Sequence, residues 1–189
     1  MKPVERSEIL DWVTYEERRA ELRPLAIETK SARRIQVGDA FAFLFENRDT
    51  VRYQVQEMMR IERIVREPDI RHEIATYNEL ISGPGELSAS LLIEYDTPEE
   101  RNVWLRDLLG LENHVWVQIG NLPPARARFD TRQIATDRIS SVQYIKFLPG
   151  VEALKSIRDG VRVFADHPKY NASTTLTSEQ VNALATDVG

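Results

Sequence analysis

The chain has 189 residues, with 25 Lys and Arg against 30 Asp and Glu, and a formal net charge of −5 at pH 7. It has no cysteine, which excludes disulfides, thiolate nucleophiles, cysteine-ligated zinc and iron–sulfur clusters carried on this chain. Its three histidines also exclude a histidine-rich metal site. Because binding to nucleic acid needs a basic stripe, the acidic balance argues against nucleic acid as the main partner.

The length and the hydropathy pattern predict one α+β domain over residues 1–189. No apolar run approaches the roughly 18 residues of a membrane span, so we expect no membrane partner. The first ten residues carry charges where a signal peptide needs an apolar core, and we therefore expect a cytoplasmic protein. Neither a G-x-G-x-x-G loop nor a Walker loop occurs, so no nucleotide cofactor is predicted.

Residues 1–33 have the pattern of a helical N-terminal arm that packs on the domain. The segment Thr-Tyr-Glu-Glu at 14–17 has the spacing of a capping box, and Pro24 predicts a kink or a split in the helix. The period then changes, because apolar residues fill both faces of an alternating pattern over 35–46. This pattern predicts a strand that is covered on both faces, with a bend or bulge at Gly38.

Two helical patterns follow, over 48–65 and 68–81, and Ser-Gly-Pro-Gly at 82–85 ends the second. Residues 87–95 alternate cleanly between apolar and polar, which predicts a half-buried strand. The next helix is expected over 97–109. Its start, Thr-Pro-Glu-Glu, combines an N-cap, a first-turn proline and a capping-box glutamate.

The second half of the chain is mostly strand. Short helices are expected at 149–158 and after residue 177. We expect strands at 115–119, 125–134, 141–147, 161–165 and 172–176. Helices therefore dominate the first half and strands the second. This order predicts an α+β fold with a mainly antiparallel sheet, either open or curled into a half-barrel, packed by the helices of the N-terminal half.

The helix predicted over 48–65 holds the first candidate site. A helical wheel centred on Val51 places Glu62 inside the apolar stripe and Gln54 at its margin. A carboxylate that faces a core must be paired, hydrogen-bonded or protonated. One interpretation is a buried ion pair, with Arg48, Arg52 or an arginine from elsewhere in the chain as the partner. The other is a polar pocket between this helix and the sheet that holds a ligand or a metal, with Glu57 on the other side of the helix.

The segment Asp-His-Pro-Lys-Tyr at 166–170 holds the second candidate site. His167 precedes a proline, which favours extended geometry, and strand ends often carry functional side chains. The alternative is a simple turn. His72 is expected to face solvent, and His114 to lie in a loop. The candidate ligand-binding residues are thus Arg48, Gln54, Glu57, Glu62, His167 and Tyr170.

Several segments resemble an uncharacterised bacterial family of the domain-of-unknown-function kind. The most specific is the stretch LFENRDTVRYQVQEMMRIER over 44–63, and shorter matches include VWVQIG at 115–120 and DHPKY at 166–170. The resemblance covers nearly the whole chain. It implies a link to iron or peroxide metabolism, because members tend to be encoded beside rubrerythrin and an iron–sulfur oxidoreductase. It implies no catalytic residue.

The first hypothesis is a non-catalytic accessory or ligand-binding protein of a cytoplasmic redox or oxidative-stress system, with the iron–sulfur oxidoreductase or rubrerythrin as its partner. The second is a small metal-dependent enzyme that binds iron or manganese through N and O ligands. Glu57 or Glu62 would join His167 around that metal, and Tyr170 would be the acid. The third is a structural homodimer in which Glu62 and Arg48 pair across the core.

Overall fold

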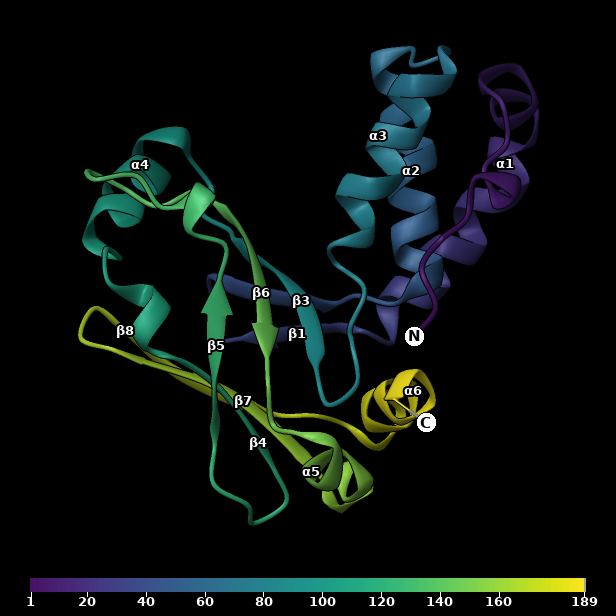
Figure 1. Cartoon of the computed structure of the whole chain (residues 1–189). Helices are drawn as coiled ribbons and strands as arrows, with labels where there is room; N and C mark the ends of the chain where they lie inside the picture. The colour runs from purple at the N-terminus through teal and green to yellow at the C-terminus, as the bar shows by residue number, and fades with distance from the viewer. Residues whose placement is uncertain (189) are drawn as a thin grey trace.

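The computed structural model describes residues 1–188, and Figure 1 shows how their helices and strands are arranged. The helices are α1 (Trp12–Ser31), α2 (Arg48–Glu62), α3 (Glu67–Asn78), α4 (Pro98–Asp107), α5 (Val151–Lys155) and α6 (Ser178–Val188). The strands are β1 (Arg34–Val37), β2 (Phe41–Phe45), β3 (Leu87–Ile93), β4 (Val115–Ile119), β5 (Ala125–Phe129), β6 (Val142–Phe147), β7 (Val161–His167) and β8 (Tyr170–Thr175).

The strands form one eight-stranded sheet in the order β1-β2-β3-β6-β5-β4-β7-β8, and every neighbouring pair is antiparallel. The sheet curls until its two edge strands meet. There the Thr174 hydroxyl of β8 donates to the Gln36 carbonyl of β1 at 2.6 Å. The Gln180 amide, at the start of α6, donates to the Arg34 carbonyl at 3.1 Å. The predicted α+β fold with a mainly antiparallel, curled sheet is confirmed.

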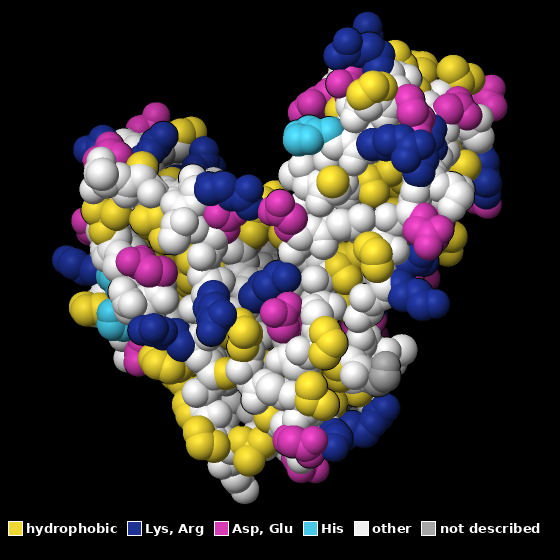
Figure 2. Space-filling view, in the orientation of Figure 1, with side chains coloured by type: hydrophobic (Ala, Val, Ile, Leu, Met, Phe, Trp, Pro, Cys, Tyr) yellow, Lys and Arg dark blue, Asp and Glu magenta, His cyan; other side chains and the backbone are white. Residues whose placement is uncertain are grey.

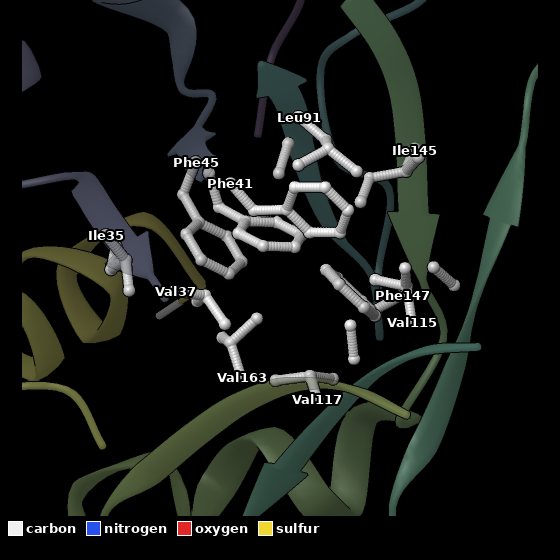
Figure 3. Packing of buried hydrophobic residues seen from close by; sticks show 14 of the residues in the cluster. Ile35, Val37, Phe41, Phe45, Leu91, Val115, Val117, Ile145, Phe147 and Val163 are labelled. Carbon is white, nitrogen blue, oxygen red and sulfur yellow. The ribbon is translucent and has the colours of Figure 1, made fainter. Parts of the chain in front are cut away.

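The inside of the curled sheet holds the main hydrophobic core (Figure 3). Strands β4 and β7 bury every second residue, as their alternating sequences predict. Phe45 of β2 and Phe147 of β6 stack inside it with ring centroids 6.1 Å apart. Burying each of these rings stabilises the fold by roughly 1.5–3 kcal/mol. Because side chains alternate along a strand, the polar neighbours of the core residues fall on the outer face of the sheet.

Residues 35–46, predicted as one bent strand, form two strands of a hairpin instead. Ile35 of β1 lies opposite Phe43 of β2. Between the strands Gly38 has a φ of 64°, and a Cβ atom at this position would lie 2.5 Å from the hydroxyl oxygen of Tyr170. Glycine is the residue that tolerates both the positive φ and the close approach. The glycine that suggested a bend therefore permits a full reversal of the chain.

α1 is one continuous helix, although Pro24 predicted a kink or a split. Its N-cap is Asp11 rather than Thr14, because the Asp11 carboxylate accepts the N–H groups of Val13 and Thr14 at 3.1 Å. Pro24 cannot donate to the carbonyl of Ala20. Both residues are exposed, so water can hydrogen-bond to the Ala20 carbonyl in place of the missing N–H group. The helix therefore continues through the proline.

α2 and α3 stand beside the sheet as a helical lobe, with α1 packed on α2 (Figure 1). A second hydrophobic cluster holds this lobe together. Its buried members are Val4, Ile9, Val51, Val55, Met59, Ile70, Ile74, Leu80 and Ile81. None of the helices within residues 1–188 combines the length and the apolar character needed to cross a lipid bilayer.

Two of the predicted boundaries, at Thr97 and at the end of β5, can be compared directly with the structure. The cap at Thr97 is confirmed, since its side chain accepts the Glu100 N–H at 3.1 Å and Pro98 begins α4. The strand predicted over 125–134 is too long, because β5 ends at Phe129. The Asp130 side chain caps a 3-10 turn there and accepts the N–H of Arg132 at 3.0 Å.

Candidate ligand cavity

A cavity of about 350 Å³ lies on the outer face of the sheet, where the end of α3 comes close to β3, β5 and β6. Figure 2 shows a hollow between the helical lobe and the sheet where side chains of both charges gather. The volume is in the range of small-molecule sites. The lining residues are Glu79, Leu80, Glu86, Ser88, Arg128, Phe129, Asp130, Arg132, Tyr144, Ile145, Lys146 and Leu148.

Three polar side chains form a row across the sheet along one wall of the cavity. Ser88 of β3 is paired with Lys146 of β6, and Lys146 is paired with Arg128 of β5. Their neighbours along the strands, such as Phe147 and Ala127, are buried in the core. Since side chains alternate between the two faces, the row Ser88–Lys146–Arg128 points outward from the core.

The hydroxyl of Ser88 is buried without a hydrogen-bond partner in residues 1–188. The residue is 2% exposed, and its backbone N–H is satisfied by the Ser82 hydroxyl at 2.9 Å. An unpaired buried polar group costs about 1–3 kcal/mol of stability, so native proteins carry few of them and a ligand is one explanation. Ser88 is therefore the residue of the row that most needs a partner.

The cations of the row are held loosely. Lys146 Nζ lies 3.3 Å from Glu86 Oε2 and 3.4 Å from the Ile81 carbonyl, longer than the 2.7–2.9 Å typical of charged hydrogen bonds. The Gly83 N–H, and then Lys146 and Arg128, hold the pKa of Glu86 below its usual range. Arg128 makes no ion pair with the residues that the structure describes.

A third cation spans the mouth of the cavity. Arg132 Nη2 lies 2.7 Å from an oxygen of Asp130 in its own turn, and 2.7 Å from Glu79 Oε2 at the end of α3. The hydrogen bond from the Arg132 side chain keeps the pKa of Asp130 below its ordinary value. This pair of contacts joins the sheet to the helical lobe across the cavity.

A buried carboxylate lies behind the cavity wall. Glu46, between β2 and α2, is 8% exposed and accepts the hydroxyls of Ser90 at 2.6 Å and Thr50 at 2.5 Å. Burial raises the pKa of Glu46, and the hydroxyl hydrogen bonds oppose that rise. Ser90 is paired in turn with Tyr144, which lines the cavity. Burial, and then Glu46, raise the pKa of the Tyr144 phenol, so it is protonated at neutral pH.

The candidate residues on α2 lie away from this cavity. Arg48 contacts the Glu8 carboxylate and donates to the Pro3 carbonyl at 3.3 Å, so it anchors the N-terminal segment. Glu57 accepts the Tyr15 hydroxyl at 2.7 Å and Arg19 Nε at 2.8 Å, which ties α1 to α2. Their roles in ligand binding stay predictions.

Glu62 is exposed, and its predicted place in a core-facing stripe is wrong. α2 ends at Glu62, because Arg63 adopts a left-handed φ of 54°, and Val65 beyond it is 68% exposed. Glu62 and Arg48 are the two ends of α2, roughly 20 Å apart along its axis. An ion pair between them across the core is therefore excluded. Gln54, also on α2, is half-buried beside the Tyr77 hydroxyl.

Both ring nitrogens of His167 bond to backbone. His167 Nε2 lies 3.2 Å from the Leu109 carbonyl, and Nδ1 accepts the Lys169 N–H at 3.2 Å. His114 lies next to it, with ring centroids 5.1 Å apart, and its Nδ1 is 3.0 Å from Asp166. The segment is the tight turn between β7 and β8, as the simpler interpretation predicted.

Tyr170 closes the curled sheet. Its hydroxyl donates to the Val37 carbonyl at 2.6 Å and accepts the Ala40 N–H at 3.0 Å. Its ring stacks on Phe41 with centroids 3.9 Å apart. These contacts, which hold the β1–β2 hairpin against β8, use the hydroxyl that a general acid would need free.

The predicted candidates do not converge. Glu62 is the last residue of α2 in the helical lobe and His167 the last residue of β7, and the end of α2 lies far from the β7–β8 turn in Figure 1. His72 is exposed on α3. No group of three or more His, Asp or Glu side chains within 1–188 is arranged to hold a metal ion.

The alternation of the sequence could have shown that Ser88, Arg128 and Lys146 occupy outward positions. It could not show that they form one row, because β3, β5 and β6 are paired out of chain order.

Residues 3–188 match the sequence model of a family described as "Protein of unknown function (DUF3501)". The whole chain is similar to a crystal structure of a novel protein of unknown function from Burkholderia pseudomallei K96243. The two share 26% sequence identity and a TM-score of 0.92, and the match covers 100% of each chain. No curated protein matches the chain.

Proposed function

The chain belongs to the DUF3501 family of proteins of unknown function, and from that premise we propose that it is a non-catalytic protein that binds a small molecule in the cavity between α3 and the sheet. The proposal names a binding role and a place for it. The sequence predicts a ligand-binding protein with a polar pocket between the helix over 48–65 and the sheet. The proposal keeps that role but assigns the binding site to the cavity beside the row Ser88–Lys146–Arg128.

The observation that carries this proposal is the Ser88 hydroxyl. It belongs to a residue that lines the cavity, and it is buried without a partner among residues 1–188. Its burial costs stability unless another molecule supplies a hydrogen bond. A ligand in the cavity would lie beside this residue and the two cations of the same row.

The charges around the cavity favour binding over acid–base catalysis. General acids and bases work best with pKa values near the operating pH. Glu86 and Asp130 have pKa values held below their ordinary ones, so both are ionised and weakly basic at neutral pH. The Tyr144 phenol has a raised pKa and stays protonated there. These groups suit fixed recognition of a ligand.

A thermal-shift screen against a library of small polar metabolites tests the proposal. At a hundredfold excess over its Kd, a ligand of the folded state adds about 2.7 kcal/mol of stability and so raises Tm. Ser88→Leu, which fills the cavity wall, should abolish the shift, while Ser173→Leu on the exposed face of β8 should keep it. Each shift is measured from the variant's own Tm, because a buried leucine also strains the sheet.

Two results would contradict the proposal. One is a library in which no compound raises the Tm of the wild-type chain. The other is a set of hits that stabilise Ser88→Leu as much as the wild type, which would place their binding elsewhere.

A binding role is consistent with the cytoplasmic redox setting that the family resemblance implies. A chain without cysteine supplies no thiolate ligand for a cluster, so an iron–sulfur oxidoreductase or rubrerythrin would carry the electrons. The chain would then detect or deliver a small molecule for that partner. Size-exclusion chromatography of the purified chain with each partner tests this association. If the chain forms a complex with neither partner, the association is contradicted.

A further inference from the structure

We infer that the ligand of this cavity is a small organic anion, a carboxylate or a phosphate ester, held by the row Ser88–Lys146–Arg128. This inference rests on the proposed binding role and adds the chemical class of the ligand.

The first argument is the local charge. Lys146 and Arg128 occupy directly paired positions of β6 and β5 on the same face of the sheet. Like charges in such cross-strand positions destabilise a sheet. Glu86 is the carboxylate that contacts Lys146, and Arg128 has no ion-pair partner in the described part of the chain. This end of the cavity therefore carries two cations against one carboxylate, and an anion would restore the balance.

The second argument is the supply of hydrogen-bond donors. A guanidinium presents N–H groups in a planar fork that suits carboxylate and phosphate oxygens, and an ammonium presents three donors. Lys146 uses its donors in contacts of 3.3 and 3.4 Å, which leaves room for a shorter bond. The Ser88 hydroxyl donates to nothing within 1–188. Three neighbouring residues of the cavity lining thus carry donors that suit an anionic group.

The third argument separates the two ends of the cavity. Arg132 at the mouth faces the two carboxylates of Asp130 and Glu79, so the mouth carries one net negative charge and the row is the end of the cavity that attracts an anion. The other lining residues include the apolar side chains of Leu80 and Leu148 and the ring of Tyr144. An anionic head on the row with a short apolar or aromatic body against these side chains matches both the lining and the volume of about 350 Å³.

Isothermal titration at low ionic strength tests the class of ligand with matched probes. Succinate and benzoate represent carboxylates, their amides succinamide and benzamide are neutral analogues, and inorganic phosphate and phenyl phosphate represent the phosphate arm. We expect at least one anion to bind, and its neutral analogue to bind at least roughly tenfold more weakly, because hydrogen bonds to a charged group are about twice as strong as neutral ones. The arm that binds more tightly identifies the head group.

Variants locate the binding. Lys146→Met and Arg128→Met should each weaken the binding of the best anion by roughly 10- to 100-fold, the loss expected for one charged hydrogen bond. Arg126→Met is the matched control: Arg126 lies on the same strand and the same face as Arg128 but does not line the cavity. The Kd of this variant for the anion should stay within about twofold of the wild-type value. The lost charge lies outside the cavity and alters only a long-range attraction that salt screens.

The two proposals fail in different ways. If library hits are neutral or cationic, if an amide binds as tightly as its acid, or if Lys146→Met and Arg128→Met bind the anion as the wild type does, the anion inference is overturned while the binding role stands. If neither the library nor any probe binds the wild-type chain, the binding role itself fails, and the anion inference with it.

Discussion

Ser88 and Ser90 lie two residues apart on the same face of β3, and only Ser90 has a partner for its hydroxyl. Ser90 donates to Glu46 at 2.6 Å, whereas the Ser88 hydroxyl meets no acceptor in residues 1–188. Both residues are buried, at 6% and 2% exposure. Two serines in nearly the same setting therefore make opposite contributions to stability.

This contrast predicts the outcome of two alanine variants. Ser88→Ala removes an unpaired buried hydroxyl, so the free energy of unfolding should stay constant or rise by up to about 1 kcal/mol. Ser90→Ala removes a hydrogen bond to a buried carboxylate and should lower it by about 1.5–3 kcal/mol. Urea unfolding measures both. A loss for Ser88→Ala as large as that for Ser90→Ala would mean that Ser88 has a partner within the chain.

Glu46 should make stability depend on pH. Burial raises its pKa from the ordinary value of 4.5, so above pH 4.5 the folded state binds more protons than the unfolded state. Stability from this group is full below pH 4.5 and is lost as the pH rises towards the folded-state pKa, by at most about 1.4 kcal/mol per pH unit. Urea unfolding of the wild type and Glu46→Gln between pH 5 and 8 checks this, and the variant should have the flatter profile. Parallel profiles would contradict the assignment.

Tyr170 should behave as a structural residue. Tyr170→Phe keeps the stack on Phe41 but removes the hydroxyl that bonds Val37 and Ala40. We expect a loss of about 1–3 kcal/mol in the free energy of unfolding, because a buried carbonyl and an N–H group lose their partner. Tyr95→Phe is the control, since the Tyr95 hydroxyl makes no hydrogen bond in the described residues and its ring stacks on Trp104 in the same way. Equal stability of the two variants would refute this role.

Glu57 should hold α1 on the helical lobe. Burial alone would raise its pKa, but hydrogen bonds from Arg19 and Tyr15 hold it below the ordinary value of 4.5. Its stabilising effect is therefore present above pH 4.5 and is lost as the pH falls through the lower, folded-state pKa. Glu57→Gln should raise the hydrogen-exchange rates of α1 at pH 7 while β3 and β6 keep theirs. Unchanged exchange in α1 would show that other contacts hold it.

The sequence was sufficient to predict those elements that are defined by their own local pattern of residues. The alternating sequences of β4 and β7, and the N-cap at Thr97, gave elements that the structure contains. Residues 35–46 form a hairpin and not one bent strand because Gly38 takes a φ of 64°, and a Cβ at this position would also clash with Tyr170, a residue 132 positions away. Local sequence carries no signal for such a contact.

The cavity could not be predicted, because its row is assembled from three strands paired out of chain order. One of the six candidates from the sequence, Glu62, was placed on the core-facing stripe by a helical wheel that extended the helix to residue 65. Arg63 ends the helix in a left-handed conformation, which arginine seldom adopts and which the pattern does not reveal. Glu46, which is buried, lies two residues before the first residue of α2, so a helical wheel of α2 does not include it.

The most direct test of the central claim is an NMR titration of the ¹⁵N-labelled chain with the tightest-binding anion. The cavity site predicts that the largest saturable shifts of backbone amide signals lie at Ser88, Arg128, Tyr144 and Lys146, and that Lys146→Met reduces them. Shifts confined to other elements, such as the turn at His167, or no saturable shift at all, would contradict the assignment of this cavity as the ligand site.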